Sequence, residues 1–211
     1  MRTERDVPKE DGRQVQEATA DDIEVSMLQV PGGLDRWNLV VDFLRLRKEV
    51  FMDRLGWPLY AREELEFEQY DTVHAVYAVA HIRDRVLGGA RLLPTTHRVG
   101  QGSYVYSYMI RDACRNILPG LPGDLCDEPP PVDPETWEMT RLATLGDAQV
   151  GAQILLATNA HLKSLGVQRC LFLASPTFMR MARRMGFVTT PLGDIKSNAD
   201  GRFLAFSSQV I

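Results

Sequence analysis

The chain has 211 residues, of which 45% are apolar and 25% charged, a size and composition that favour one substantial globular domain. Its formal net charge of −4 argues against a nucleic-acid binder with a broad basic surface. No apolar run is long enough to cross a bilayer, and no signal-peptide core follows the charged N-terminus. We therefore expect a cytoplasmic protein with neither nucleic acid nor a membrane among its partners.

The first part of the chain predicts an arm, a strand and a helix. Residues 1–20 are rich in charge and poor in large apolar groups, which indicates a mobile arm ahead of a single domain over 21–211. An edge strand is expected over 23–28. From Asp35 onward apolar residues recur at helical spacing, which predicts a helix that stops at Gly56.

The middle of the chain predicts a β-hairpin followed by irregular structure. Two runs of small and β-branched residues, 72–80 and 86–93, are joined by a charged turn. The stretch 97–135 is rich in glycine and proline and is expected to be irregular. A strand is expected to resume near Trp137.

The last part of the chain alternates helices and strands. A helix is expected over 150–165 and a buried strand over 169–174, after which Pro176 opens a short helix. Two final strands near 187–190 and 203–210 complete the pattern. Strands that come first as a meander and then alternate with helices predict a mixed sheet with helices on both faces.

The cysteines and histidines give no sign of a disulfide framework or a metal site. The three cysteines are widely spaced and odd in number, so free thiols are expected. The four histidines are also scattered, without the pairing typical of zinc ligands. These residues are Cys114, Cys126 and Cys170, and His74, His81, His97 and His161.

Arg47 is the first residue that could belong to a functional site. It follows Phe43 by four residues and precedes Phe51 by four, so on a helix it shares their apolar face. A guanidinium group in that position needs an acidic partner. The partner could form a structural ion pair that locks the helix to the following loop, or it could be an acid held in place for a substrate; the two interpretations are compatible.

The acidic run after the helix offers such partners. In an extended segment Glu66, Glu68 and Tyr70 would face one way, and Phe67, Gln69 and Asp71 the other. Acids in exposed loops are usually solvated. Trp57 and Tyr70 flank this run, however, and acids beside a tryptophan ring would suit a cationic ligand that carries an aromatic base.

Arg91 and the segment around Trp137 carry further charges. Arg91 is expected on the strand face shared by Leu87, Gly89 and Leu93, where adjacent glycines mark a bulge or a close backbone approach. It is therefore a second candidate partner for the acids. Glu138 and Arg141 are three residues apart and would lie on opposite faces of an ideal strand. They could line one site only if that strand is bulged or ends there.

Three arginines crowd one short predicted helix in this acidic protein. The ordinary interpretation is a solvated helix face, and the functional alternative is a docking surface for an acidic partner. The three are Arg180, Arg183 and Arg184.

The order and spacing of eight of these residues resemble the signature of one family, the acyl-homoserine-lactone synthases, which make the autoinducers of bacterial quorum sensing. The matching positions run from the first helix to the strand near Trp137, and later residues match in general layout only. One position departs from the pattern, because Glu68 stands where the family has an aspartate. The eight are Arg47, Phe51, Trp57, Glu66, Asp71, Arg91, Glu138 and Arg141.

The resemblance implies a fold like that of the GNAT-type acetyltransferases, an α/β/α sandwich of three layers with a mixed, splayed sheet that admits a pantetheine arm. It implies no prosthetic group. S-adenosylmethionine is implied as a substrate, with an acyl chain carried on acyl carrier protein or on coenzyme A. The amine of S-adenosylmethionine attacks the thioester, and its carboxylate then displaces methylthioadenosine to close the lactone.

The resemblance also assigns roles to residues. Glu66 or Glu138 would be the general base, and Glu68 and Asp71, braced by Arg47 and Arg91, would shape the substrate pocket. By the same resemblance, Phe51 and Trp57 would form the pocket wall and Arg141 would contact the substrate. Phe172 would line the acyl pocket. The carrier-protein docking surface would be formed by Arg180, Arg183 and Arg184. Phe172 aligns near a threonine of members that take 3-oxo chains, which implies an acyl group without a 3-oxo function.

Two alternatives compete with this interpretation. A plain GNAT-type N-acyltransferase would use acyl-CoA on another amine, and it usually carries a glycine-rich loop that opens a helix and binds pyrophosphate. The segment 145–152 is a weak match to such a loop, with an acid where phosphate would bind. The other alternative is a non-catalytic homologue that binds carrier protein, for which the Glu68 departure is the hint in the sequence.

Overall fold

The computed structural model describes residues 22–102, 104–146, 148–198 and 201–211. The arm predicted over 1–20 lies outside the described residues. Helical segments of the described residues are η2 (Leu34–Arg36), α1 (Trp37–Arg47), the π-helical η3 (Lys48–Arg54), α2 (Met109–Cys114), α3 (Ala148–Ser164) and α4 (Pro176–Arg184). The strands are β1 (Glu24–Leu28), β2 (Ala61–Arg62), β3 (Leu65–Glu66), β4 (Val76–Ile82), β5 (Arg85–Pro94), β6 (Val99–Gln101), β7 (Tyr104–Tyr106), β8 (Thr136–Thr144), β9 (Arg169–Ala174), β10 (Thr189–Pro191), β11 (Lys196–Asn198) and β12 (Gly201–Gln209).

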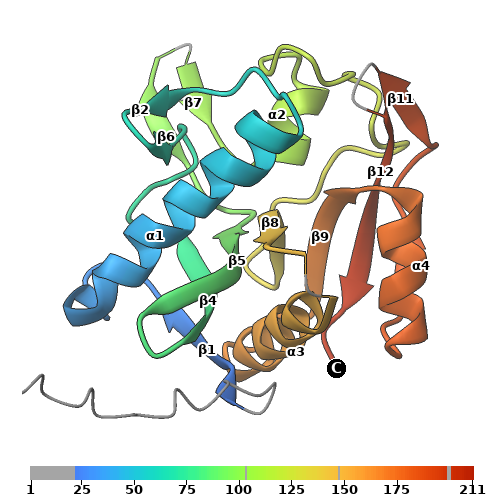
Figure 1. Cartoon of the computed structure of the whole chain (residues 1–211). Helices are drawn as coiled ribbons and strands as arrows, with labels where there is room; N and C mark the ends of the chain where they lie inside the picture. The colour runs from blue at the N-terminus through green and yellow to red at the C-terminus, as the bar shows by residue number, and fades with distance from the viewer. Residues whose placement is uncertain (1–21, 103, 147, 199–200) are drawn as a thin grey trace, which may run out of the picture.

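One mixed sheet organises the molecule. Its strand order is β1-β4-β5-β8-β9-β12-β10, with β11 paired to β12, and only the β8–β9 pairing is parallel. Helix α1 covers one face of the sheet and α3 the other (Figure 1). Helix α4 lies beside β9 and β12, which come late in the chain (Figure 1). The mixed sheet with helices on both faces was predicted from the sequence pattern, and the three layers are those that the family resemblance implies.

The central strands are buried on both faces, which explains their nearly continuous apolar sequence. In β4, Tyr77 and Val79 pack with α1, whereas Val76, Ala78 and Ala80 pack with α3. The predicted β4–β5 hairpin is confirmed. The stretch expected to be irregular, 97–135, contains β6, β7 and α2, so the prediction was wrong for those short elements.

Strands β8 and β9 separate part of the way along their length. Their parallel pairing runs from Thr136 opposite Arg169 to Met139 opposite Phe172, and β8 continues to Thr144 without β9 as a partner. The sheet is splayed at this point.

Two irregularities in the sheet set the direction of key side chains. Between β4 and β5 the register shifts next to Leu87, which packs on the α3 face, so the expectation that Leu87 shares a face with Arg91 was wrong. Between β5 and β8 the register shifts again, with Gly89 opposite Ala143 and Arg91 opposite Thr140. Both shifts occur beside Gly88 and Gly89.

Neither of these glycines has room for a side chain. A Cβ atom on Gly88 would lie 2.7 Å from the carbonyl oxygen of Ala143, and one on Gly89 would lie 2.8 Å from the ring of Phe43. The close backbone approach predicted from the paired glycines is therefore confirmed.

Candidate active site

Arg47 lies at the C-terminal end of α1, fully buried, and its guanidinium carbon is 5.8 Å from the ring centre of Phe43. Helical spacing places it on the apolar face, as predicted. The chain then continues as the π-helical η3, in which Phe51 is buried. Stretches of π-helix are frequent at functional sites.

The acidic run is not extended, so the predicted alternation of its side chains was wrong. After β3, the amide of Asp71 donates to the carbonyl of Glu68 at 2.9 Å, and the amide of Glu68 donates to Asp71 Oδ2 at 2.9 Å. This turn brings Asp71 to the same side as Glu66. The sequence shows no glycine or proline that would have marked the turn.

A bulge in β8 places Arg141 in the same site. Two residues, Arg141 and Leu142, occupy the position opposite Ala90, and Arg141 has a φ of 55°. The bulge returns Arg141 to the face that carries Glu138 and Thr140. The condition under which Glu138 and Arg141 could line one site is therefore met.

The three guanidinium groups and three carboxylates form one network. Arg47 hydrogen-bonds to Glu66 and makes a bidentate pair with Asp71 at 2.8 and 3.0 Å. Arg91 lies 3.1 Å from Asp71 Oδ1. Arg141 Nε lies 3.4 Å from Glu66 Oε1. The free-energy cost of burying charged groups is much lower when each is paired with an opposite charge, as in this network.

Glu68 connects two of the arginines. Its carboxylate accepts from Arg91 Nη2 at 2.6 Å and from Arg141 Nη2 at 2.8 Å. The glutamate at this position therefore pairs with two cations at once. Its side chain is 14% exposed, against 0% for Glu66 and Asp71, so it is the most accessible carboxylate of the network.

These contacts fix the ionisation of the acids. Burial would raise the pKa of Asp71, but the guanidinium groups of Arg91 and Arg47 hold it well below its usual range. Burial likewise opposes the charge on Glu68, and Arg91 and Arg141 nevertheless keep its pKa below the ordinary value. Both groups are carboxylates at neutral pH.

An aromatic pair borders the network. The rings of Phe51 and Trp57 are stacked, with centres 5.1 Å apart and planes 13° apart. The guanidinium carbon of Arg141 lies 5.6 Å from the centre of the Phe51 ring. The stacked aromatic pair therefore lies next to Arg141.

Glu138 is a different kind of acid from the other three. Its two oxygens accept hydrogen bonds from the amides of Met109 and Ile110, each at 2.8 Å. Burial raises the pKa of Glu138 to about 7, although these amides and Arg91 act in the opposite direction. A buried acid with a pKa near neutrality is suited to general acid–base chemistry.

Sequence reasoning missed α2 and Asp112, which support this acid. Asp112 is fully buried and accepts a hydrogen bond from the hydroxyl of Tyr70 at 2.9 Å. The signal that could have found the helix is the spacing of Ile110 and Ala113 in a stretch free of glycine and proline.

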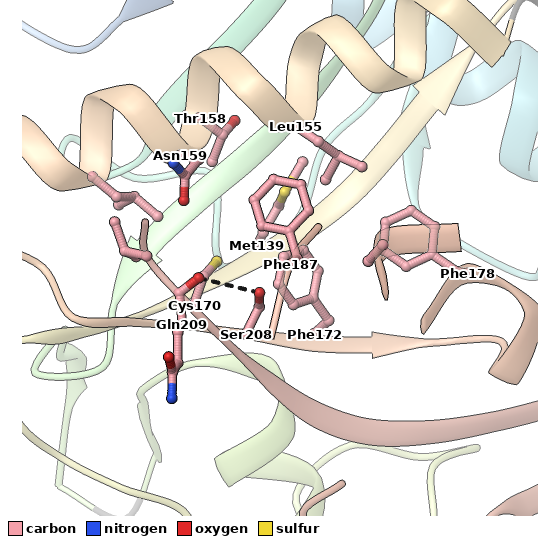
Figure 2. A pocket seen from close by; sticks show the side chains of 13 residues that line it. Met139, Leu155, Thr158, Asn159, Cys170, Phe172, Phe178, Phe187, Ser208 and Gln209 are labelled. Carbon is pink, nitrogen blue, oxygen red and sulfur yellow. Dashed lines mark hydrogen bonds between the residues drawn. The ribbon is translucent and has the colours of Figure 1, made fainter. Parts of the chain in front are cut away.

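Phe172 lies apart from the charged network, in an apolar cavity of about 20 Å³ on the α3 face (Figure 2). It stacks on Phe206 with ring centres 5.0 Å apart. Met139, the last residue of β8 paired with β9, also lines this cavity. The cavity therefore adjoins the point where the strands separate.

The three arginines of α4 do not join the acidic network. Arg180, Arg183 and Arg184 are exposed. Arg183 donates to the hydroxyl and carbonyl of Thr189 at 2.7 and 3.1 Å. Figure 1 shows α4 at the other end of the sheet from α1.

Within the described part of the chain, no group of histidine, cysteine and acidic side chains is arranged to hold a metal ion. No helix among these residues is long and apolar enough to span a bilayer.

Comparison with known proteins identifies acyl-homoserine-lactone synthases as relatives of this chain. The autoinducer synthase family model matches residues 34–118. An acyl-homoserine-lactone synthase of Pseudomonas chlororaphis is 30% identical, over 76% of this chain and 75% of that relative. A second one, of Pseudomonas aeruginosa, is 29% identical over 74% of this chain and 71% of that relative.

Solved structures agree on the fold. BjaI, a CoA-dependent acyl-homoserine lactone synthase solved with S-adenosylmethionine and isopentyl-CoA, superposes with a TM-score of 0.75 at 21% identity, covering 90% of this chain and 84% of that one. The synthase LasI gives a TM-score of 0.71 at 21% identity, over 90% of each chain.

Proposed function

Because the chain belongs to the acyl-homoserine-lactone synthase family, we propose that it acylates the amine of S-adenosylmethionine from an acyl thioester and closes the product to a lactone, a quorum-sensing signal. The observation that carries this proposal is the buried array of three guanidinium groups and three carboxylates beside Phe51 and Trp57. We further propose that the chain acts in the cytoplasm.

The reaction has two bond-forming steps. In the first, the neutral amine of S-adenosylmethionine attacks the thioester carbonyl, an amide N–C bond forms, the C–S bond breaks and the carrier thiol leaves. The proton lost by the amine passes through a general base to the leaving thiolate. In the second, the methionyl carboxylate forms an O–C bond at the γ-carbon, whose bond to the sulfonium breaks and releases methylthioadenosine. The protein mainly positions the groups and manages one proton.

Glu138 is better suited than Glu66 to be the base. Its raised pKa, about 7, lets it both accept and return a proton near neutral pH. Glu66 is fully buried and paired with Arg47 and Arg141, so its charge is already committed to two cations. Because Glu138 is only 1% exposed, it would exchange the proton through a bound water molecule.

The remaining network would hold the cationic substrate. Glu68, the most accessible carboxylate, would face the sulfonium, and Asp71 would keep the arginines in place. Phe51 and Trp57 would form the wall of the pocket, and Arg141 would contact the methionyl carboxylate.

The separation of β8 and β9 would admit the acyl thioester. Beyond Met139 and Phe172 the two strands no longer pair. The charged network lies on the α1 face there and the apolar cavity on the α3 face. A thioester placed in the opening would therefore present its carbonyl to the amine and its acyl chain to the cavity.

The function is tested by incubating the purified protein with S-adenosylmethionine and a panel of acyl donors, on carrier protein and on CoA, while methylthioadenosine is measured. We expect release that depends on the acyl donor. Free thiol that appears only when other amines are supplied would instead indicate a general N-acyltransferase. No release and no thiol would contradict an acyltransferase function with these donors.

We propose acyl carrier protein as the donor, docked on the exposed arginines of α4. Replacing Arg180 and Arg184 together by glutamate should raise the KM for acylated carrier protein by about tenfold, because the attraction to an acidic partner is reversed. The kcat should change little. Steady-state kinetics with purified carrier protein measure both quantities.

The matched control is Arg85→Glu, an exposed arginine in the β4–β5 hairpin. It should leave the KM for carrier protein unchanged. An unchanged KM in the Arg180/Arg184 double variant would contradict docking at α4.

We also propose an acyl group without a 3-oxo function. Phe172 offers no hydroxyl to a 3-oxo oxygen and stacks on Phe206 in the cavity. Phe172→Thr should raise the kcat/KM ratio of 3-oxoacyl to unsubstituted donors by about tenfold, since a hydroxyl would then meet the polar oxygen. Phe172→Val, which opens the same space without a hydroxyl, should not. A dominant 3-oxo product from the wild-type protein, detected by mass spectrometry, would refute the proposal.

A further inference from the structure

The buried acid Glu138 is held by the main chain of a very short helix. Both of its oxygens accept from the first two amides of α2, those of Met109 and Ile110, at 2.8 Å. Helix α2 has six residues, far fewer than a helix needs to be stable by itself. Its position, and with it the position of the two amides, must be fixed by contacts outside the helix.

Ile110 and Ala113 pack into a buried apolar cluster, and Asp112 adds the directional polar contacts. Its side chain is fully buried and accepts three hydrogen bonds, from the Tyr70 hydroxyl at 2.9 Å, the Ser107 amide at 2.7 Å and Arg115 Nη1 at 3.0 Å. The Ser107 amide belongs to the segment that enters α2, so this bond fixes the start of the helix. A buried carboxylate with three donors is a strong, directional anchor.

One of the three donors comes from the charged site itself. Tyr70 lies in the turn between Glu68 and Asp71, and its ring centre is 5.4 Å from the guanidinium carbon of Arg91. The hydroxyl of the same residue reaches Asp112. The acidic turn and α2 are therefore joined through one side chain.

We infer that Asp112 is a positioning residue, which fixes α2 so that its first two amides hold Glu138, and which joins α2 to the acidic turn through Tyr70. The inference rests on the proposed function in that Glu138 is taken as the base. Asp112 itself does not touch the reacting atoms.

The groups around Glu138 set the direction of the expected effect. Burial raises the pKa of Glu138, the Ile110 and Met109 amides and Arg91 lower it, and the charge of Asp112 raises it with the weakest of these effects. When Asp112 is replaced, the weaker hold of the Met109 and Ile110 amides on Glu138 should outweigh the loss of the charge of Asp112. The pKa of Glu138 should therefore rise. The titratable and charged groups that face Glu138 from neighbouring elements are Tyr70, Arg91, Tyr108, Asp112, Cys126 and Cys170.

The test is a direct titration of Glu138. In protein labelled with ¹³C at glutamate carboxyl carbons, the Glu138 signal is identified by its absence in Glu138→Gln. In Tyr70→Phe, which removes only the hydroxyl that joins the turn to Asp112, we expect a pKa above that of the wild type. In Asp112→Asn we expect a larger rise, of about one unit, which corresponds to an about tenfold lower kcat/KM at pH 6 and a smaller loss at high pH.

The matched control is Asp133→Asn, the same chemical change just before β8, where Asp133 pairs with the exposed Arg169. It should leave the Glu138 titration unchanged. An unchanged or lowered pKa in Tyr70→Phe overturns the inference, and so does either result in a folded Asp112→Asn protein. If Asp112→Asn does not fold, Tyr70→Phe decides alone.

The titration separates this inference from the proposed function. It needs no substrate, so a failure of the protein to release methylthioadenosine would leave the result on Asp112 standing. A loss of stability without a change in the pKa would mean that Asp112 has a structural role alone and would overturn the positioning role.

Discussion

Glu138→Gln is expected to lower the rate of methylthioadenosine release by about 10²–10⁴-fold, the contribution usual for a general base. The variant removes the acid whose pKa lies at about 7 while keeping its size. The wild-type rate should also fall as the pH drops below about 7, because Glu138 is then protonated and cannot accept the amine proton. Single-turnover kinetics across pH 5–9 measure both effects.

The control for this change is Glu135→Gln, an exposed acid just before the same strand. It should retain wild-type activity and the same pH profile. A Glu138→Gln protein with undiminished activity would contradict the assignment of the base and move that role to Glu66.

Arg47→Met is expected to lower the free energy of unfolding by about 3–5 kcal/mol, the cost of leaving one partner of a buried ion pair uncompensated. Methionine fills much of the same volume, so packing changes less than charge. The variant leaves Glu66 and Asp71, both with fully buried side chains, short of a cation. Denaturation by urea, followed by circular dichroism, gives the change in stability.

The matched control lies two residues away on the same helix. Arg45 is 56% exposed and pairs with Asp42 across one helical turn, so Arg45→Met should cost well under about 1 kcal/mol. Equal losses of unfolding free energy in the two variants would show that the buried network stabilises the fold no more than an exposed ion pair does.

The pH dependence of stability has a definite sign. The pKa of Asp71 is lower in the folded chain than in the unfolded chain. The ion pairs of Asp71 therefore stabilise the fold fully above about pH 4, the unfolded value, and that contribution is lost as the pH falls. Arg47→Met should weaken this acid sensitivity.

The sequence predicted the elements whose signals are local. The helical spacing that begins at Leu39 located α1 and the buried position of Arg47, and the charged turn at Asp84 located the β4–β5 hairpin. The paired glycines indicated a close approach before Arg91, which the structure confirms. These signals depend on residues near one another in the chain, so periodicity and turn chemistry can detect them.

The parts that could not be predicted depend on contacts between distant segments. The turn at Glu68 is closed by the side chain of Asp71, which faces arginines from α1 and β5. Helix α2 is too short for a clear periodic pattern. The Tyr70 hydroxyl that donates to Asp112 comes from 42 residues earlier in the chain. No local rule would have connected Asp112 to Glu138.

The π-helical stretch η3 has a consequence for how this segment tolerates changes in length. A π-turn closes its hydrogen bonds over one more residue than an α-turn does, so it is in effect an α-helix with a single-residue insertion. Here the amide of Leu55 bonds to the carbonyl of Val50, five residues earlier. Deleting one residue from Lys48–Arg54 would remove the extra residue and restore regular α-helix, and the chain on either side would keep approximately its direction. The segment therefore has one residue to spare, and a deletion that keeps Phe51 in place should leave Trp57 stacked on it.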